Sequence, residues 1–167
     1  MILKHSIEVE TFSTHFSEVE IFVNDLKCYT KQYQANKKYK DIIEFEYDYQ
    51  DSTKNQLKIL YSGDQKSQER YFKIESLLIN NQNVELQNSN YTPNFNQAWI
   101  DSLDPKTKDS ILQIVYGNHN SHYGWFGNIT YKYYTSKDKK SKDKYYKQLD
   151  IMEKVIKQRI NWIYDKL

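Results

Sequence analysis

Residues 42–49 alternate strictly between apolar and acidic side chains, and this feature limits the possible fold more than any other. The apolar set is Ile43, Phe45, Tyr47 and Tyr49, and the acidic set is Glu44, Glu46 and Asp48. A two-residue period is typical of a β-strand with one buried face. A polar turn and then Leu57, Ile59 and Tyr61 follow, so the pattern predicts a β-hairpin. The carboxylates could in principle bind a metal, but a solvated sheet face explains them fully.

Other segments predict a mixture of strands and helices. Residues 2–12 and 129–134 have strand patterns, and the Asn-rich residues 80–96 predict a loop. Ser17 and Glu20 have the spacing of a helix capping box, which predicts a helix from Ser17 to about residue 36. Further helices are predicted at 105–116 and 142–166, with a short one near 95–103. Residues 70–79 fit either type, and we favour a helix. The last helix would bury Tyr145, Leu149, Met152, Ile156, Ile160 and Ile163.

These elements predict an α+β fold. A small mixed or antiparallel sheet would be packed by a long N-terminal helix and a long C-terminal helix. The 167 residues suit one core, so residues 1–167 are expected to form a single domain. Sixteen Tyr, seven Phe and three Trp indicate that this core is rich in aromatic rings.

The rest of the composition bears on location and chemistry. Cys28 is the single cysteine, which excludes an internal disulfide and favours a reducing compartment. No apolar run is long enough to cross a bilayer, so we expect a cytoplasmic protein without a membrane partner. No sequence motif indicates a cofactor or a complete catalytic set. The 22 Lys against 2 Arg are typical of an AT-rich genome, which lowers the weight of charge arguments.

Residues 117–128 are the first candidate functional segment, because three of the four glycines fall there. Glycine is scarce in this chain, so its clustering predicts unusual backbone geometry. Two histidines three residues apart could bind a metal or supply a base, although no third ligand follows from spacing. Exposed rings on such a loop could instead anchor a partner. The candidate binding residues are Asn118, His119, His122, Tyr123, Trp125 and Phe126.

The C-terminal part of the chain is the second candidate. Residues 131–167 carry a net charge of +6, while residues 1–130 carry −4. Lysines are interleaved with tyrosines between 131 and 147, a mixture that can neutralise phosphates and stack on bases. The candidate residues are Lys137, Lys139, Lys140 and Lys142. A solvated, lysine-rich linker is the simpler explanation.

Three classes of function remain open. The first is a non-enzymatic protein that binds another protein, such as an inhibitor, an immunity protein or a phage-encoded antagonist of a defence system. The second is a nucleic-acid-binding protein that uses the basic C-terminal third. The third is a small metal-dependent hydrolase or nuclease that uses His119 and His122. We favour them in that order, and the sequence does not indicate an oligomeric state.

Overall fold

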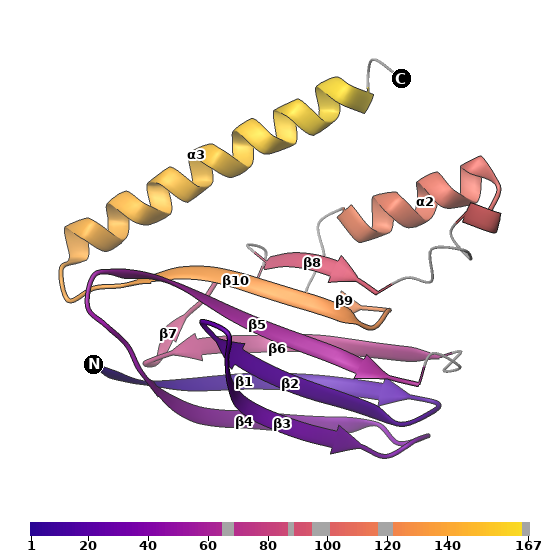
Figure 1. Cartoon of the computed structure of the whole chain (residues 1–167), viewed down its shortest axis with the longest axis horizontal. Helices are drawn as coiled ribbons and strands as arrows, with labels where there is room; N and C mark the ends of the chain where they lie inside the picture. Colours follow the sequence, from indigo (N-terminus) through magenta and orange to yellow (C-terminus); the bar gives the residue numbers. More distant parts are fainter. Residues whose placement is uncertain (65–68, 87–88, 95–100, 117–121, 165–167) are drawn as a thin grey trace.

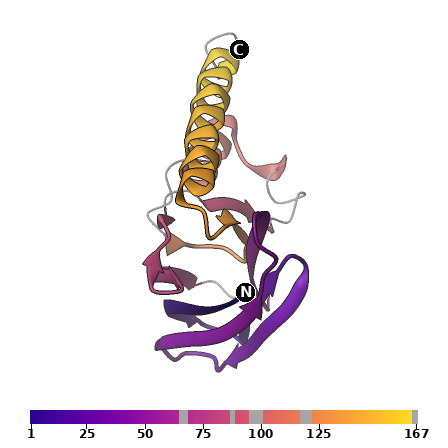
Figure 2. The same ribbon diagram turned by 90° about the vertical axis from the view of Figure 1, so that its left-hand side faces the viewer.

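The computed structural model consists of two antiparallel β-sheets packed face to face (Figures 1 and 2). It describes residues 1–64, 69–86, 89–94, 101–116 and 122–164. In sheet A, β4 (Tyr39–Asp48), β1 (Ile2–Ser13), β6 (Arg70–Ile79) and β7 (Gln82–Asn83) lie in that order, and β9 (His122–Tyr123) also pairs with β6. In sheet B, the order is β3 (Leu26–Tyr33), β2 (Ser17–Val23), β5 (Thr53–Gly63), β10 (Gly127–Thr135) and β8 (Ser89–Pro93).

The core lies between the two sheets and takes alternate residues from each strand. Sheet A contributes Ile7, Val9, Ile43, Phe72, Ile74 and Leu77, and sheet B contributes Val19, Ile21, Val23, Leu57, Ile59 and Ile129. Aromatic rings join the layers: Tyr61 stacks on Phe72 at a centroid distance of 5.3 Å, and its hydroxyl donates to the carbonyl of Phe12 at 3.2 Å. The predicted α+β class is therefore wrong, because sheet packs on sheet and neither of the described helices covers the core.

The long helix predicted from Ser17 to about residue 36 is wrong. These residues form the β2–β3 hairpin, with Ser17, Val19, Ile21 and Val23 buried on one face. Asn24 and Asp25 form its turn with φ values of 49° and 66°, the conformation that lets a two-residue turn join twisted strands. The apolar residues fitted both periods. The β-branched residues and the Asn-Asp pair were the signals that favoured strands.

Two other predictions fail in a related way. Residues 70–79 form strand β6 rather than a helix. The strands predicted around 42–49 and 57–61 exist as β4 and β5, but they do not pair as a hairpin. β4 pairs with β1 in sheet A, while β5 pairs with β2 and β10 in sheet B. The chain crosses between layers at this turn, a choice that alternation along one strand does not encode.

Two helices are described beyond the sheets. α2 (Pro105–Tyr116) begins after Asp104, whose carboxylate accepts the amide of Thr107 at 3.0 Å. α3 (Lys139–Tyr164) begins after Asp138, which accepts the amide of Ser141 at 3.2 Å. α3 contacts β10 near its start and then rises away from the sheets, so the predicted packing of this helix on the sheet is wrong (Figure 1). Met152, expected in its buried stripe, is 58% exposed.

Candidate functional site: a tyrosine-lined groove

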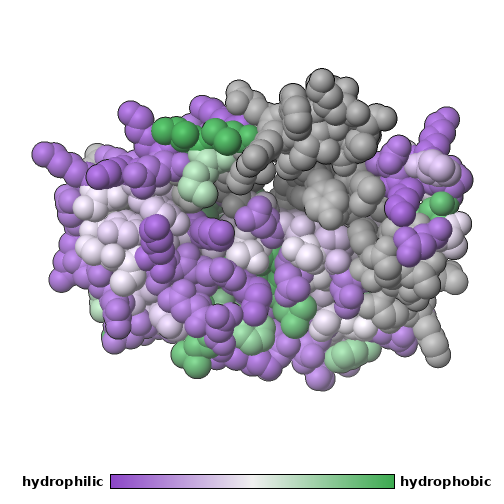
Figure 3. All heavy atoms as spheres, turned by 45° about the horizontal axis from the view of Figure 1, so that its top comes forward, coloured by the Kyte–Doolittle hydropathy of each residue, from purple (hydrophilic) through white to green (hydrophobic). Residues whose placement is uncertain are grey.

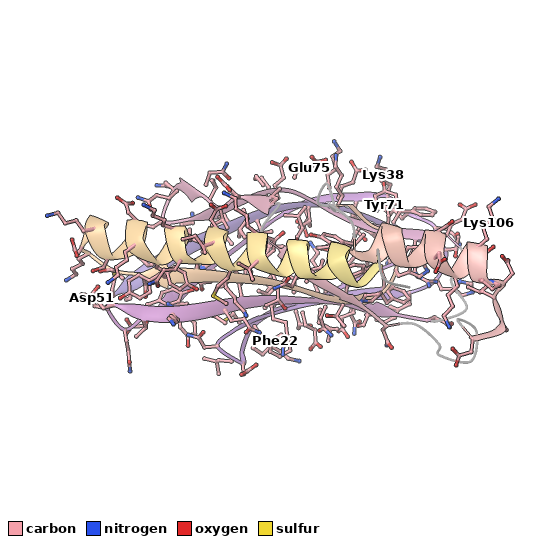
Figure 4. All side chains as sticks on the ribbon, turned by 90° about the horizontal axis from the view of Figure 1, so that it is seen from above. Phe22, Lys38, Asp51, Tyr71, Glu75 and Lys106 are labelled. Atoms are coloured by element: carbon pink, nitrogen blue, oxygen red, sulfur yellow. The ribbon has the colours of Figure 1, made fainter. Side chains whose placement is uncertain are left out.

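A groove of about 960 Å³ lies at the end of the sandwich where α3 begins. Its floor and walls come from the last residues of β10, the start of β1, the β6–β7 turn and the second and third turns of α3. Figure 4 shows Asp51 at this end of the molecule, and its carboxylate accepts the amide of Lys137 at 2.9 Å. That bond ties the segment before α3 to the β4–β5 turn. The groove is lined by residues near both ends of the sequence, such as Met1 and Asp150.

The groove is open because β8 and β10 pair along only part of their length. Within the described residues, their pairing ends at Tyr131 opposite Ser89. β10 continues to Thr135, bonded on its other side to β5. At this end α3 approaches the edge of β10, and the Tyr134 amide donates to the Tyr146 hydroxyl at 3.4 Å. Tyr146 remains 43% exposed, so its ring stands at the groove's border.

Beneath the groove lie buried tyrosines that a hydrogen-bond chain holds in place. The hydroxyl of Tyr133 bonds that of Tyr49, which in turn bonds Nε2 of His5 at 2.7 Å. Burial raises the pKa of Tyr133 and of Tyr131 above the usual range for a phenol. Burial also lowers the pKa of His5 to about 4. At neutral pH these buried tyrosines are thus uncharged, and the tyrosine rings exposed to the groove are those of the half-buried Tyr134 and the exposed Tyr146.

The walls of the groove combine amide side chains with a few apolar groups. Asn80 and Asn81 have φ values of 51° and 61° and turn the chain from β6 into β7. The amides of this wall are Asn80, Gln82, Asn83 and Asn90, and its apolar members are Met1, Leu3, Ile79 and Val84. A carboxamide both donates and accepts hydrogen bonds, so this wall can bind a neutral polar ligand.

Charged residues at the groove nearly balance. Lys132, Lys137 and Lys147 face Glu85 and Asp150 among its described lining residues. Asp150 is also paired with Lys154 at 2.9 Å. The electrostatic potential of the groove therefore does not strongly favour either an anionic or a cationic ligand.

The described residues of the predicted binding loop precede β10 and lie at its opposite end. Tyr123 is buried and its hydroxyl bonds that of Ser89 at 2.9 Å. Phe126 is also buried, with its ring edge on Tyr61 and the Arg70 guanidinium 4.7 Å from its centroid. Trp125 is partly exposed. Asn118 and His119 lie outside the described residues, as does the side chain of His122, so a role for this loop stays a prediction.

The predicted lysines are only partly brought to the groove. Lys137 lines it, and Lys140 is exposed on the first turn of α3. The side chains of Lys139 and Lys142 lie outside the described part of the chain. The tyrosines noted between 131 and 147 turn out to be the main groove residues, whereas Asn80, Asn83 and Asn90 were missed. Only the Asn-rich composition of 80–96 pointed to them.

The described residues show neither a metal site nor a membrane-spanning helix. No three His, Cys, Asp or Glu side chains gather closely enough to hold an ion in the part of the chain that the structure describes. None of the described helices is long and apolar enough to cross a bilayer.

No protein-family model matches the chain, and no curated protein is significantly similar to it. Among solved structures, one described as "vCBM60 in complex with galactobiose" has a TM-score of 0.46 at 12% identity, covering 76% of this chain and 95% of that one. A selenomethionine form of vCBM60, described with two families of calcium-dependent carbohydrate binding modules, has a TM-score of 0.45 at 11% identity, covering 77% and 88%. Similarity at this level does not indicate what the present chain binds.

Proposed function

We propose that this chain is a non-catalytic binding module that takes a neutral oligosaccharide in the tyrosine-lined groove. The observation that carries the proposal is the combination of the accessible Tyr134 and Tyr146 rings with a wall of amides. A sugar ring has an apolar face of C–H groups that packs on aromatic rings, and hydroxyls that bond to carboxamides. The volume lies in the range of small-molecule sites, and the nearly balanced charges suit a ligand without net charge.

A panel of neutral oligosaccharides tests this function directly. We expect one class of neutral glycan to bind in calorimetric titration, and an acidic glycan such as an oligogalacturonate to bind more weakly. Tyr146→Ala should lower the affinity by about tenfold, because it removes the exposed ring at the groove border. Tyr39→Ala is the matched control, since Tyr39 pairs with Thr11 at the other end of the sandwich. Binding that is absent, or equally weakened by both substitutions, would refute the proposal.

A protein partner is the second candidate, and the edge of β10 favours it. The Tyr134 amide points away from β5, so the main-chain groups of Lys132, two residues earlier, point to the same side. An extended peptide could pair with this edge as an added strand. Protection of the Lys132 amide from hydrogen exchange when a partner binds would identify this mode. Binding as an inhibitor, an immunity protein or a phage antagonist would each be a special case of it.

A further inference from the structure

α3 has one side attached to the sandwich and the opposite side turned to solvent. Tyr145 and Tyr146, both on its second turn, contact β10. At 100° per residue, positions 140, 144, 147, 151 and 155 share a face on the other side of the helix. We call Lys140, Lys144, Lys147, Ile151 and Val155 the outer face of α3.

The outer face combines lysines with exposed aliphatic side chains. Ile151 and Val155 are each 54% exposed, and the three lysines are exposed as well. Figure 3 shows a small apolar patch on this part of the surface, bordered by hydrophilic side chains. Lys154 flanks the patch with a side chain 70% exposed. The exposed fractions show that nothing in the described part of the chain covers this patch.

The lysines of this face are available to an external anion. Among the described residues, Lys140, Lys144 and Lys147 have no carboxylate within ion-pair distance, whereas Lys154 is paired with Asp150. Along the helix, the first part of the face, from Lys140 to Lys147, is basic, and the second part, Ile151 and Val155, is aliphatic. An occupant must therefore offer negative charge beside an apolar layer.

We propose that the outer face of α3 lies on an anionic lipid surface. The lysines would contact lipid phosphates, while Ile151 and Val155 would enter the boundary between head groups and acyl chains. Such a helix lies in the interface and need not cross the bilayer. Lys147 also lines the edge of the groove, whereas Ile151 and Val155 do not, and this inference does not depend on the proposed function.

Other anionic occupants fit this face less well. A protein groove that takes a helix needs apolar anchors at three- and four-residue steps along its length, and the first half of this face has only lysines. Nucleic acid would satisfy the lysines, but its phosphate backbone offers nothing apolar to Ile151 and Val155. A bilayer offers both to a helix that lies in its interface, because lysine side chains extend to the phosphates while Ile151 and Val155 enter the acyl boundary.

Vesicle sedimentation tests the proposal with the full chain. The probes are vesicles of phosphatidylcholine alone and vesicles containing roughly one third phosphatidylglycerol. We expect binding only to the acidic vesicles. Replacing Lys140, Lys144 and Lys147 with Gln should lower the partition coefficient by about 100-fold, and Ile151→Ser with Val155→Ser should lower it further at high salt. All five side chains are exposed, so circular dichroism should show that the variants keep their fold.

The control removes the same charge elsewhere. Lys37, Lys40 and Lys106 are exposed; Lys40 pairs with Glu10 on β1, away from the start of α3, and Lys106 is seen on α2 in Figure 4. Replacing these three with Gln should leave vesicle binding within about twofold. The proposal is overturned if wild type ignores acidic vesicles, or if the control loses as much binding as the α3 variant. It also fails if a duplex DNA oligonucleotide binds instead and the two serine substitutions have no effect.

Discussion

The ring of Tyr145 on α3 stacks on the ring of Tyr134 on β10, with centroids 5.1 Å apart and planes inclined by 26°. Tyr145 is buried, whereas Met152, two turns further along the same side of the helix, is largely exposed. Among the described side chains of α3, this stacked pair is therefore the apolar attachment to the sandwich, while those of Leu149, Ile156, Ile160 and Ile163 lie outside the described part of the chain. The stacked pair also fixes where Tyr146 stands at the border of the groove.

Tyr145→Ala should loosen α3 without unfolding the sheets. We expect faster amide exchange in residues 139–150 and unchanged protection in β1, β5 and β10, because the strands are held by their own ladders. Tyr145→Phe keeps the ring and should behave like wild type. Hydrogen-exchange mass spectrometry checks both variants. Unchanged exchange in the Ala variant would mean that another contact holds the helix.

Two aliphatic-to-alanine substitutions separate the core from the helix. Ile59 is fully buried on the central strand of sheet B, so Ile59→Ala should lower the free energy of unfolding by about 2–5 kcal/mol. Met152→Ala should change it by no more than about 0.5 kcal/mol, because that side chain is mostly exposed. Urea denaturation measures both values. A large decrease in the free energy of unfolding of the Met152 variant would mean that this side chain is buried in a core.

Two glycines of the 117–128 segment should respond differently to a methyl group. A Cβ at Gly127 would lie 2.5 Å from the carbonyl oxygen of Thr92 and 2.8 Å from Cα of Pro93, so Gly127→Ala should push β8 away from β10. A Cβ at Gly124 would meet nothing within 4 Å, so Gly124→Ala is the matched control.

The expected result is a lower melting temperature for Gly127→Ala, with faster exchange in β8, and a melting curve close to wild type for Gly124→Ala. No glycine of the described chain has a positive φ, so close packing, not unusual backbone geometry, explains Gly127. Equal melting temperatures for the two variants would show that β8 can move aside without cost.

The buried His5 predicts a pH dependence of folding stability. Its folded pKa is about 4, below the 6.5 of an unperturbed histidine, because burial disfavours the imidazolium. As pH falls below 6.5, the unfolded chain takes up this proton first, so stability is full above that pH and declines down to pH 4. The loss should approach about 3 kcal/mol, and below pH 4 this contribution no longer changes.

Urea denaturation between pH 7.5 and pH 4, at steps of about half a unit, measures this decline. His5→Gln cannot take up the proton and still offers the Tyr49 hydroxyl an acceptor, so its stability should depend less steeply on pH over the same window. Parallel curves for wild type and variant would mean that other groups cause the pH dependence.

Local sequence patterns predicted several elements well. β1, β4, β5 and β10 lie where alternation predicted strands, and α2 spans the predicted helix at 105–116. The pattern failed between residues 17 and 33, where Val19, Phe22, Val23 and Leu26 fit a helical period while Val19, Ile21 and Val23 fit the alternating one. The turn residues Asn24 and Asp25 carried the deciding information, because they adopt positive φ more readily than most residues.

For the groove, the sequence indicated some of the residue types that line it but not that they meet. The cluster of tyrosines after Tyr131 was visible in the sequence, and a stacking role for it was considered. The partners of these rings come from distant parts of the chain: Tyr133 bonds Tyr49, and the amide wall comes from the β6–β7 turn. No spacing rule connects residues 49, 80 and 133, so their meeting could not be inferred from the sequence.

By itself, the sequence determined which residues could alternate in a strand, which could cap a helix and which could supply rings, because these properties depend on neighbours within a few positions. Only the tertiary structure decided which strands pair, which sheet each one joins and where the chain crosses between layers. Those choices depend on burying the apolar faces of all strands at once. β4 and β5 illustrate the difference, since each was recognisable as a strand and yet they belong to opposite sheets.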